Sequence, residues 1–145
     1  MKKYIFLFTI FGLSLQGSFL RDNINEVVFD TTTHLMWQDD YYIERDSKKT
    51  SWIDGINYCE NLDKASYTDW KMPNINELIT IIDLKANTPA IDSTFRYATS
   101  EVYWSSTTSK SKPTHTWGVD FEAGSIKSEV DKSTLNHTRC VRKYK

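Results

Sequence analysis

The sequence predicts an α+β domain in which two short helices pack on a mostly antiparallel sheet. Apolar residues recur at helical spacing in two early segments, after residue 50 and after residue 73. From residue 102 onward, short runs of aromatic and β-branched residues separated by turns are typical of strands. Apart from an early hairpin, helices and strands are thus segregated along the chain, which favours α+β over alternating α/β folds.

The chain begins with the three parts of a secretory signal peptide. Residues 1–3 are a charged start, 4–13 form an apolar run, and 16–18 are small or polar. The alternative, a retained membrane anchor, needs about 20 apolar residues, and this run is shorter. We therefore expect a signal peptide at 1–17, with the cut one residue later as an alternative. One domain at 18–145 would then be exported to the periplasm or the cell exterior, contacting a membrane only transiently.

The charge of the mature chain is unevenly distributed. Without Lys2 and Lys3 it has 16 basic and 19 acidic residues, a net charge of −3. This balance predicts no general attraction to nucleic acid or to a membrane surface. The segment 109–145 nevertheless has 8 basic and 4 acidic residues, so an anionic partner is expected to meet the C-terminal third.

The N-terminal half predicts a hairpin followed by two helices. Residues 26–29 and 35–38 are strand-like and flank a turn, and a charged loop follows them. Thr50 or Ser51 caps a first helix whose buried face has apolar residues four, three and three positions apart: Trp52, Ile56, Cys59 and Leu62. Asn74 caps a second helix, and Glu77 completes a capping-box arrangement. The apolar stripe of this helix comprises Ile75, Leu78, Ile79 and Ile82.

The C-terminal half predicts a sheet. Four strands are expected, at 102–107, 115–121, 125–130 and 139–142. In the second of them Trp117, Val119 and Phe121 alternate with polar or small residues, which predicts one buried and one wet face. Gly124 lies in the turn after this strand, at a position that needs positive φ, so the second and third strands are predicted to form a hairpin.

The two cysteines are predicted to form one disulfide. Cys59 and Cys140 lie 81 positions apart, and an oxidising compartment would keep them paired. Two free buried thiols are the alternative. The three histidines are scattered: His34, His115 and His137. Without close ligand pairs no zinc site is expected, and the sequence predicts neither a metal nor another cofactor.

Several sequence blocks in a fixed order resemble one known family. They are LMWQ at 35–38, YC at 58–59 followed by Leu62, DWKMPNINEL at 69–78, YWSST at 103–107, WGVDF at 117–121 and RCVR at 139–142. The sequence is similar in these blocks to the Legionella collagen-like protein (Lcl) C-terminal domain family, over about residues 25–142.

The resemblance implies an extracytoplasmic domain with a fold related to C-type-lectin-like domains and sulfatase-modifying factors. In the family's namesake this domain belongs to a trimeric adhesin that binds sulfated glycosaminoglycans through a basic surface. The 145 residues contain no Gly-x-y repeat to drive trimerisation, and the mature part is acidic. The resemblance therefore supports the predicted fold more strongly than the predicted ligand.

Aromatic residues offer two interpretations. Trp37, Trp70, Trp104 and Trp117 could stack on sugar rings, but core packing is the expected role of each, because buried aromatics dominate small cores. Asp69 and Asn74 resemble parts of a lectin calcium site. Asn74 is better explained as a helix cap.

Basic residues give the predicted ligand site. Lys127, Arg139, Arg142 and Lys143 are the candidates, if the strands at 125–130 and 139–143 are neighbours that share a face. A solvated surface without a ligand is the alternative. The expected partner is a polyanionic glycan or an envelope protein, and an oligomer is possible.

An enzyme is the rival function, and we do not expect one. A catalytic triad can be assembled on paper from Ser105, His115 and Asp120, but no nucleophile-elbow signature supports it. The sequence thus predicts an exported domain that binds a carbohydrate or polyanion. A structural or protein-interaction domain of the periplasm is the alternative.

Overall fold

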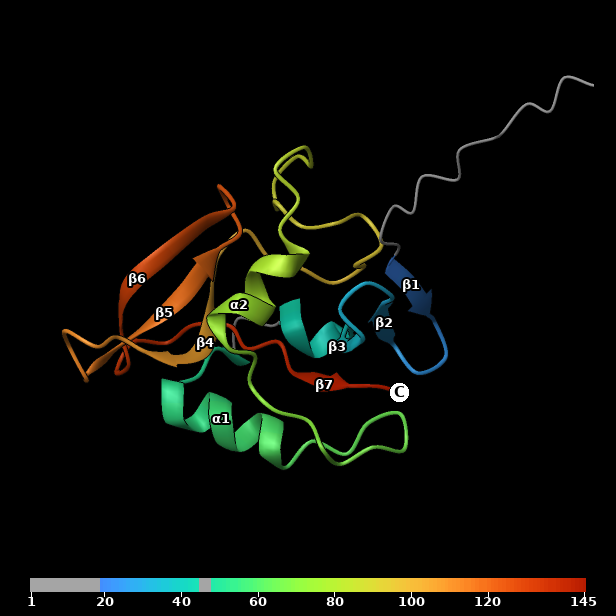
Figure 1. Cartoon of the computed structure of the whole chain (residues 1–145), viewed down its shortest axis with the longest axis horizontal. Helices are drawn as coiled ribbons and strands as arrows, with labels where there is room; N and C mark the ends of the chain where they lie inside the picture. The colour runs from blue at the N-terminus through green and yellow to red at the C-terminus, as the bar shows by residue number, and fades with distance from the viewer. Residues whose placement is uncertain (1–18, 45–47) are drawn as a thin grey trace, which may run out of the picture.

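The structure, a computed structural model, describes residues 19–44 and 48–145 (Figure 1). The predicted signal peptide at 1–17 lies outside these residues. Two antiparallel sheets and two short helices make up the domain, so the α+β prediction is confirmed. The prediction of one sheet is wrong.

The first sheet joins the two ends of the chain. Its order is β1-β2-β3-β7, with β1 at Phe19–Asp22, β2 at Val27–Asp30, β3 at Leu35–Gln38 and β7 at Val141–Lys143. The predicted hairpin is confirmed as β2 and β3, paired antiparallel with Val28 opposite Trp37. Strand β1 was not predicted. Since β7 pairs with β3, the closing strand belongs to the N-terminal hairpin.

The second sheet is a meander of three strands. It comprises β4 at Val102–Thr108, β5 at His115–Asp120 and β6 at Ser125–Asp131. The other edge of β4 is occupied before the chain reaches β7, because the backbone of His137 accepts from Trp104 and donates to Val102. This contact explains why β7 continues to the other sheet, beyond the meander in Figure 1.

Both helices begin where the sequence predicts. Helix α1 spans Trp52–Glu60, and Ser51 caps it by accepting from the backbone of Asp54. Helix α2 spans Ile75–Leu78, with both hydrogen bonds of the predicted capping box, each 2.9 Å long. It continues only as a 3-10 turn, η3 at Ile79–Ile81. A further 3-10 turn, η1, spans Tyr41–Glu44. Helix α2 packs on β4 and β5, and α1 packs on β4.

The core interpretation holds for three tryptophans and fails for one. Trp37, Trp70 and Trp104 are buried, but Trp117 is half-buried. The register of β5 against β6 shifts between Thr116 and Gly118, so the predicted alternation is wrong here. Thr116 is buried instead, and its hydroxyl donates to the carbonyl oxygens of Ser105 and Thr107.

Cys59 and Cys140 form the predicted disulfide, with Cα atoms 5.4 Å apart. The bond joins the last turn of α1 to the residue before β7, and both cysteines are fully buried. The backbone of Cys140 is also held by Gln38, whose N–H donates to the Cys140 carbonyl and whose side-chain oxygen accepts from the Cys140 N–H. The Gly124 turn is confirmed, with a φ of 63°.

Candidate functional site

The four predicted ligand residues do not form one site. Lys127 lies on β6 in the second sheet, with its ammonium 3.3 Å from a carboxylate oxygen of Asp120. The other three lie on or beside β7 in the first sheet. Because β6 and β7 are not neighbours, these residues do not share the face that the predicted site requires.

Arg139 is buried and forms hydrogen bonds inside the domain. Its side chain is fully enclosed and donates to the Gln38 carbonyl at 2.7 Å, to Asp39 at 3.0 Å and to the Tyr97 carbonyl. The guanidinium carbon also lies 4.8 Å from the Phe95 ring centroid. An arginine in this position stabilises the fold and does not meet a ligand at the surface.

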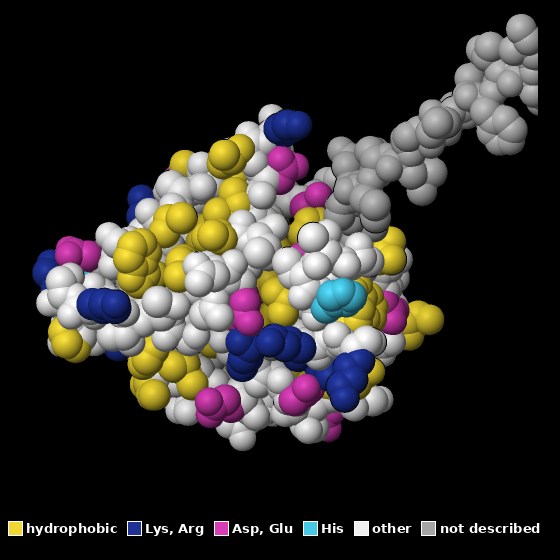
Figure 2. All heavy atoms as spheres, in the orientation of Figure 1, with side chains coloured by type: hydrophobic (Ala, Val, Ile, Leu, Met, Phe, Trp, Pro, Cys, Tyr) yellow, Lys and Arg dark blue, Asp and Glu magenta, His cyan; other side chains and the backbone are white. Residues whose placement is uncertain are grey.

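Arg142 and Lys143 line an open groove of about 480 Å³ beside β7. We call it the basic–aromatic groove; its lining residues are Phe29, Met36, Tyr67, Asp69, Arg142, Lys143, Tyr144 and Lys145. Figure 2 shows dark blue side chains gathered over β7 and the adjoining C-terminal residues, with acidic side chains beside them. The side chains of the groove include three cations and one carboxylate.

The guanidinium of Arg142 is fixed on two sides. Its Nε and Nη2 donate to the two carboxylate oxygens of Asp69, at 2.6 and 3.0 Å. Its central carbon, Cζ, lies 3.6 Å from the centroid of the Tyr67 ring. The third nitrogen, Nη1, is buried and has no hydrogen-bond partner among the described residues. The side chain is only 9% exposed, so a spare donor is held in a defined position at the groove.

Asp69 sets the charge beside this donor. Its side chain is 62% exposed, and the hydrogen bond from Arg142 lowers the pKa of its carboxyl group. Asp69 is therefore a carboxylate at neutral pH and orients Arg142 by accepting from it. Lys143 and Lys145 are exposed beside this pair, which leaves the groove side chains with an excess of positive charge.

The groove rests on a rigid aromatic support. The Tyr144 ring meets Phe29 edge to face, with centroids 5.1 Å apart, and its hydroxyl donates to the Asp30 carbonyl. Sequence reasoning missed Tyr67 and Tyr144 as site residues. Tyr144 carries a signal, because positions 142 and 144 share one face of an extended strand. Tyr67 comes from a distant loop and carries none.

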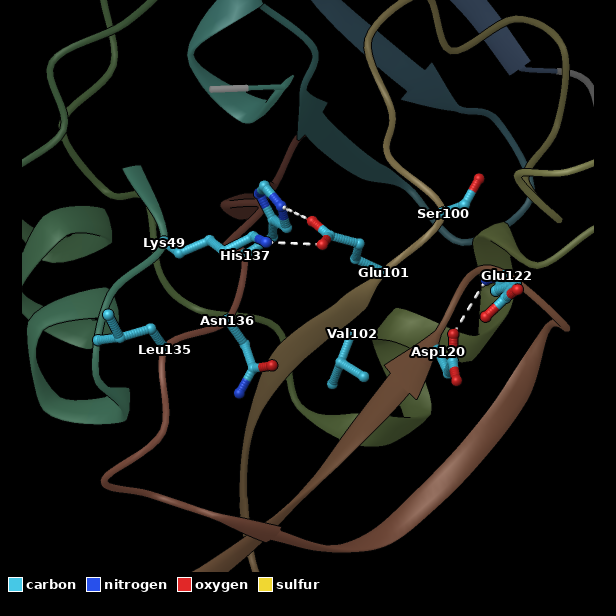
Figure 3. A pocket seen from close by; sticks show the side chains of 9 residues that line it. All are labelled: Lys49, Ser100, Glu101, Val102, Asp120, Glu122, Leu135, Asn136 and His137. Carbon is cyan, nitrogen blue, oxygen red and sulfur yellow. Dashed lines mark hydrogen bonds and ion pairs between the residues drawn. The ribbon is translucent and has the colours of Figure 1, made fainter. Parts of the chain in front are cut away.

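A second pocket, of about 360 Å³, surrounds Glu101 (Figure 3). Lys49 and His137 both point at the Glu101 carboxylate, with Nζ 2.6 Å from one oxygen and Nε2 2.5 Å from the other. Asp120 and Glu122 form a separate pair on the far side of the pocket, where the Glu122 N–H donates to Asp120 (Figure 3). His137 is only 2% exposed, so the cluster ties three segments together rather than presenting a base.

The charge of Glu101 makes the stability of the fold depend on pH. The hydrogen bond from Lys49 is the main cause that lowers its pKa below the ordinary 4.5, and His137 adds to it. A lowered carboxyl pKa stabilises the folded chain above the ordinary value, and this contribution disappears as pH falls through the folded pKa. We expect Glu101→Gln to lower the free energy of unfolding at pH 7 by up to about 1 kcal/mol, the size typical of a part-exposed ion pair.

Urea unfolding at pH 7 and at about pH 3 measures this contribution, which should shrink in acid. Glu122→Gln is the matched control, because Glu122 lines the same pocket and has no ion pair among the residues described. An equal cost of Glu101→Gln at both pH values would contradict the assignment.

The triad considered from sequence does not assemble. The Ser105 hydroxyl is buried and donates to the Trp117 carbonyl at 2.6 Å. The His115 ring is hydrogen-bonded to Thr114, and Asp120 pairs with Lys127. Each group is committed to a different neighbour.

The described part of the chain offers neither a metal centre nor a membrane-crossing helix. Within residues 19–44 and 48–145, no three His, Cys, Asp or Glu side chains are placed to hold a metal ion. Over the same ranges, no helix has the length and apolar composition to cross a membrane.

Comparison with known proteins agrees with the sequence blocks. No curated protein matches the chain. The family model described as the Lcl C-terminal domain matches residues 26–142, which includes both sheets except β1 and β7's last residue. The chain therefore belongs to the Lcl C-terminal domain family.

Proposed function

We propose that this domain binds a polyanionic carbohydrate in the basic–aromatic groove. The observation that carries the proposal is the Arg142 guanidinium, which is fixed at the groove and whose buried Nη1 has no hydrogen-bond partner among the described residues. A buried donor without an acceptor is costly, and a sulfate or carboxylate oxygen would satisfy it with a charge-assisted hydrogen bond.

The neighbouring side chains suit the same ligand. Lys143 and Lys145 are exposed on the same groove and would contact further anionic groups along a chain. Tyr67, 42% exposed, offers an aromatic surface to the apolar face of a sugar ring. The proposed site thus includes two of the four ligand residues predicted from sequence, Arg142 and Lys143, together with Lys145 and the tyrosines.

The proposal includes the setting of the domain. We infer that the chain is exported, since a Cys59–Cys140 bond persists in an oxidising compartment. We also infer a C-type-lectin-like fold, which the pairing of N- and C-terminal strands in one sheet supports. We propose no catalytic activity, because His137 is enclosed and because Ser105, His115 and Asp120 each contact a different neighbour.

A binding assay with a heparin octasaccharide tests the groove. Arg142→Ala removes the guanidinium that is fixed at the groove, and Lys143→Ala with Lys145→Ala removes the flanking charges. We expect Arg142→Ala to weaken binding about 10- to 100-fold, the size of one or two charged hydrogen bonds. Wild-type binding should also weaken with added salt. Isothermal titration calorimetry at two salt concentrations measures both effects.

Two further variants make the test specific. Lys127→Ala removes an exposed lysine from the other sheet, so it should leave affinity nearly unchanged. Asp69→Asn should bind more tightly than wild type, because asparagine keeps one oxygen to accept from Arg142 and removes a negative charge from the groove. Equal affinity of wild type and Arg142→Ala, or no binding by wild type, would overturn the proposal and favour a protein-interaction domain.

A further inference from the structure

A different groove lies on the second sheet, around Trp117. Its volume is about 480 Å³, and we call it the Trp117 groove. Its lining residues are Thr107, Thr108, Ser109, Lys110, Ser111, Trp117, Ser128 and Glu129. They come from the end of β4, the loop after it, β5 and β6.

Trp117 differs from the other tryptophans in its surroundings, because it is half-buried and lines this groove. Trp37, Trp70 and Trp104 are buried in the core. Trp52 is half-buried, and the Lys132 ammonium lies 3.9 Å from its ring centroid. Among the described residues, no aromatic ring and no cation is placed on Trp117. Trp117 therefore contributes a part-exposed aromatic side chain to this groove.

The backbone that carries this ring is fixed. The Trp117 carbonyl accepts the Ser105 hydroxyl at 2.6 Å, and β5 is hydrogen-bonded on both sides, to β4 and β6. The register shift between Thr116 and Gly118 buries Thr116 and leaves Trp117 half-buried at the groove. A side chain presented from a central strand needs little ordering when a ligand binds.

Hydroxyl groups dominate the rest of the lining. Five of the eight lining residues are Ser or Thr: Thr107, Thr108, Ser109, Ser111 and Ser128. Four of them are held by hydrogen bonds within the protein: Thr107 accepts from the Ile75 N–H, Thr108 accepts from the Lys132 ammonium, and the Ser109 and Ser111 hydroxyls lie 3.1 Å apart. Thr107 and Thr108 act there as acceptors, so each hydroxyl keeps its own proton to donate to a ligand. Lys110 and Glu129 contribute one charge of each sign, and Glu129 already pairs with Lys112 at 2.8 Å. The charges of the lining side chains thus cancel, unlike those of the basic–aromatic groove, and two further lysines, Lys112 and Lys132, bond to lining residues from outside the groove.

We propose that the Trp117 groove binds one or two rings of a neutral saccharide. A pyranose presents an apolar C–H face that packs on an aromatic ring, and its hydroxyls both donate and accept, as those of Ser and Thr do. A lining with one flat aromatic residue and several uncharged polar groups is suited to such a ligand.

Nitrogen-15 NMR of the folded, oxidised domain tests the proposal. Each tryptophan gives one indole N–H signal, and the signal missing in Trp117→Phe identifies Trp117. The probes are neutral hexasaccharides of glucose, galactose, mannose and N-acetylglucosamine. We expect at least one of them to shift the Trp117 signal, and Trp117→Ala to weaken its binding at least about tenfold.

Ser128→Arg is a second variant that fills the groove from the exposed face of β6 and leaves the tryptophan in place. It should abolish binding, while Arg142→Ala, in the other sheet, should have no effect. No movement of the Trp117 signal with any of the four probes, or equal binding by Ser128→Arg, would overturn the proposal. Because the probes carry no charge, the outcome is independent of the heparin experiment.

Discussion

Replacing Asp39 by asparagine is expected to lower the free energy of unfolding by about 3 to 5 kcal/mol, the cost typical of breaking a buried ion pair. Asp39 is fully buried and pairs with Arg139 at 3.0 Å and with Arg21. It also accepts backbone N–H groups of Arg96 and Tyr97, at 2.9 and 3.1 Å. One carboxylate therefore joins the end of β3, the segment before β4 and the segment before β7.

The large cost follows from the fixed charge of arginine. Asparagine keeps the shape of aspartate and one acceptor oxygen for the backbone N–H groups. Arg139 is fully enclosed and cannot lose its proton, so Asp39→Asn would leave its charge inside the fold beside that of Arg21. The energy lost is thus mainly the burial of unneutralised charge.

Urea unfolding measures this effect, and Glu129→Gln is the matched control. Glu129 pairs with Lys112 at 2.8 Å, but both side chains are about half exposed, so the loss of this pair should cost far less than the loss of the buried one. In the Asp39→Asn background, Arg139→Met should lower the free energy of unfolding by less than it does in the wild type, because it removes the unneutralised charge. A cost of Asp39→Asn as small as that of Glu129→Gln would contradict the buried network.

The parts of the fold predicted from sequence are those that local chemistry decides. The N-caps at Ser51 and Asn74 and the turn at Gly124 each depend on residues within three positions. The β2–β3 hairpin likewise depends on a four-residue turn. Such signals are present in the chain before any tertiary contact forms.

The errors concern contacts between distant segments. Nothing near residue 141 indicates that β7 pairs with β3 rather than with the second sheet. The shift at Thr116 depends on how β5 meets β6, and it moved Trp117 out of the predicted core. Tertiary pairing decides these features, so periodicity along one strand does not reveal them.

The candidate site shows the same division. Basic residues at the C-terminal end predicted a site there, and two of the four chosen residues line the basic–aromatic groove. Arg139 and Arg142 are three positions apart in an extended segment, so they point to opposite sides. The sequence does not say which side is buried. That answer comes from Asp39, 100 positions away from Arg139.

Reducing the Cys59–Cys140 disulfide is expected to lower the free energy of unfolding by about 4 to 5 kcal/mol, from the chain entropy of the loop it closes. The loop spans 81 positions and joins α1 to β7. Because Cys140 is two residues from Arg142, the reduced protein should also bind a heparin octasaccharide more weakly. Urea unfolding and calorimetry with and without dithiothreitol measure both effects. The Cys59→Ala/Cys140→Ala variant is the control, and dithiothreitol should not change it. Two reactive thiols in the untreated, denatured protein would refute the bond. An unchanged affinity on reduction would show that heparin binding in the basic–aromatic groove does not depend on the disulfide.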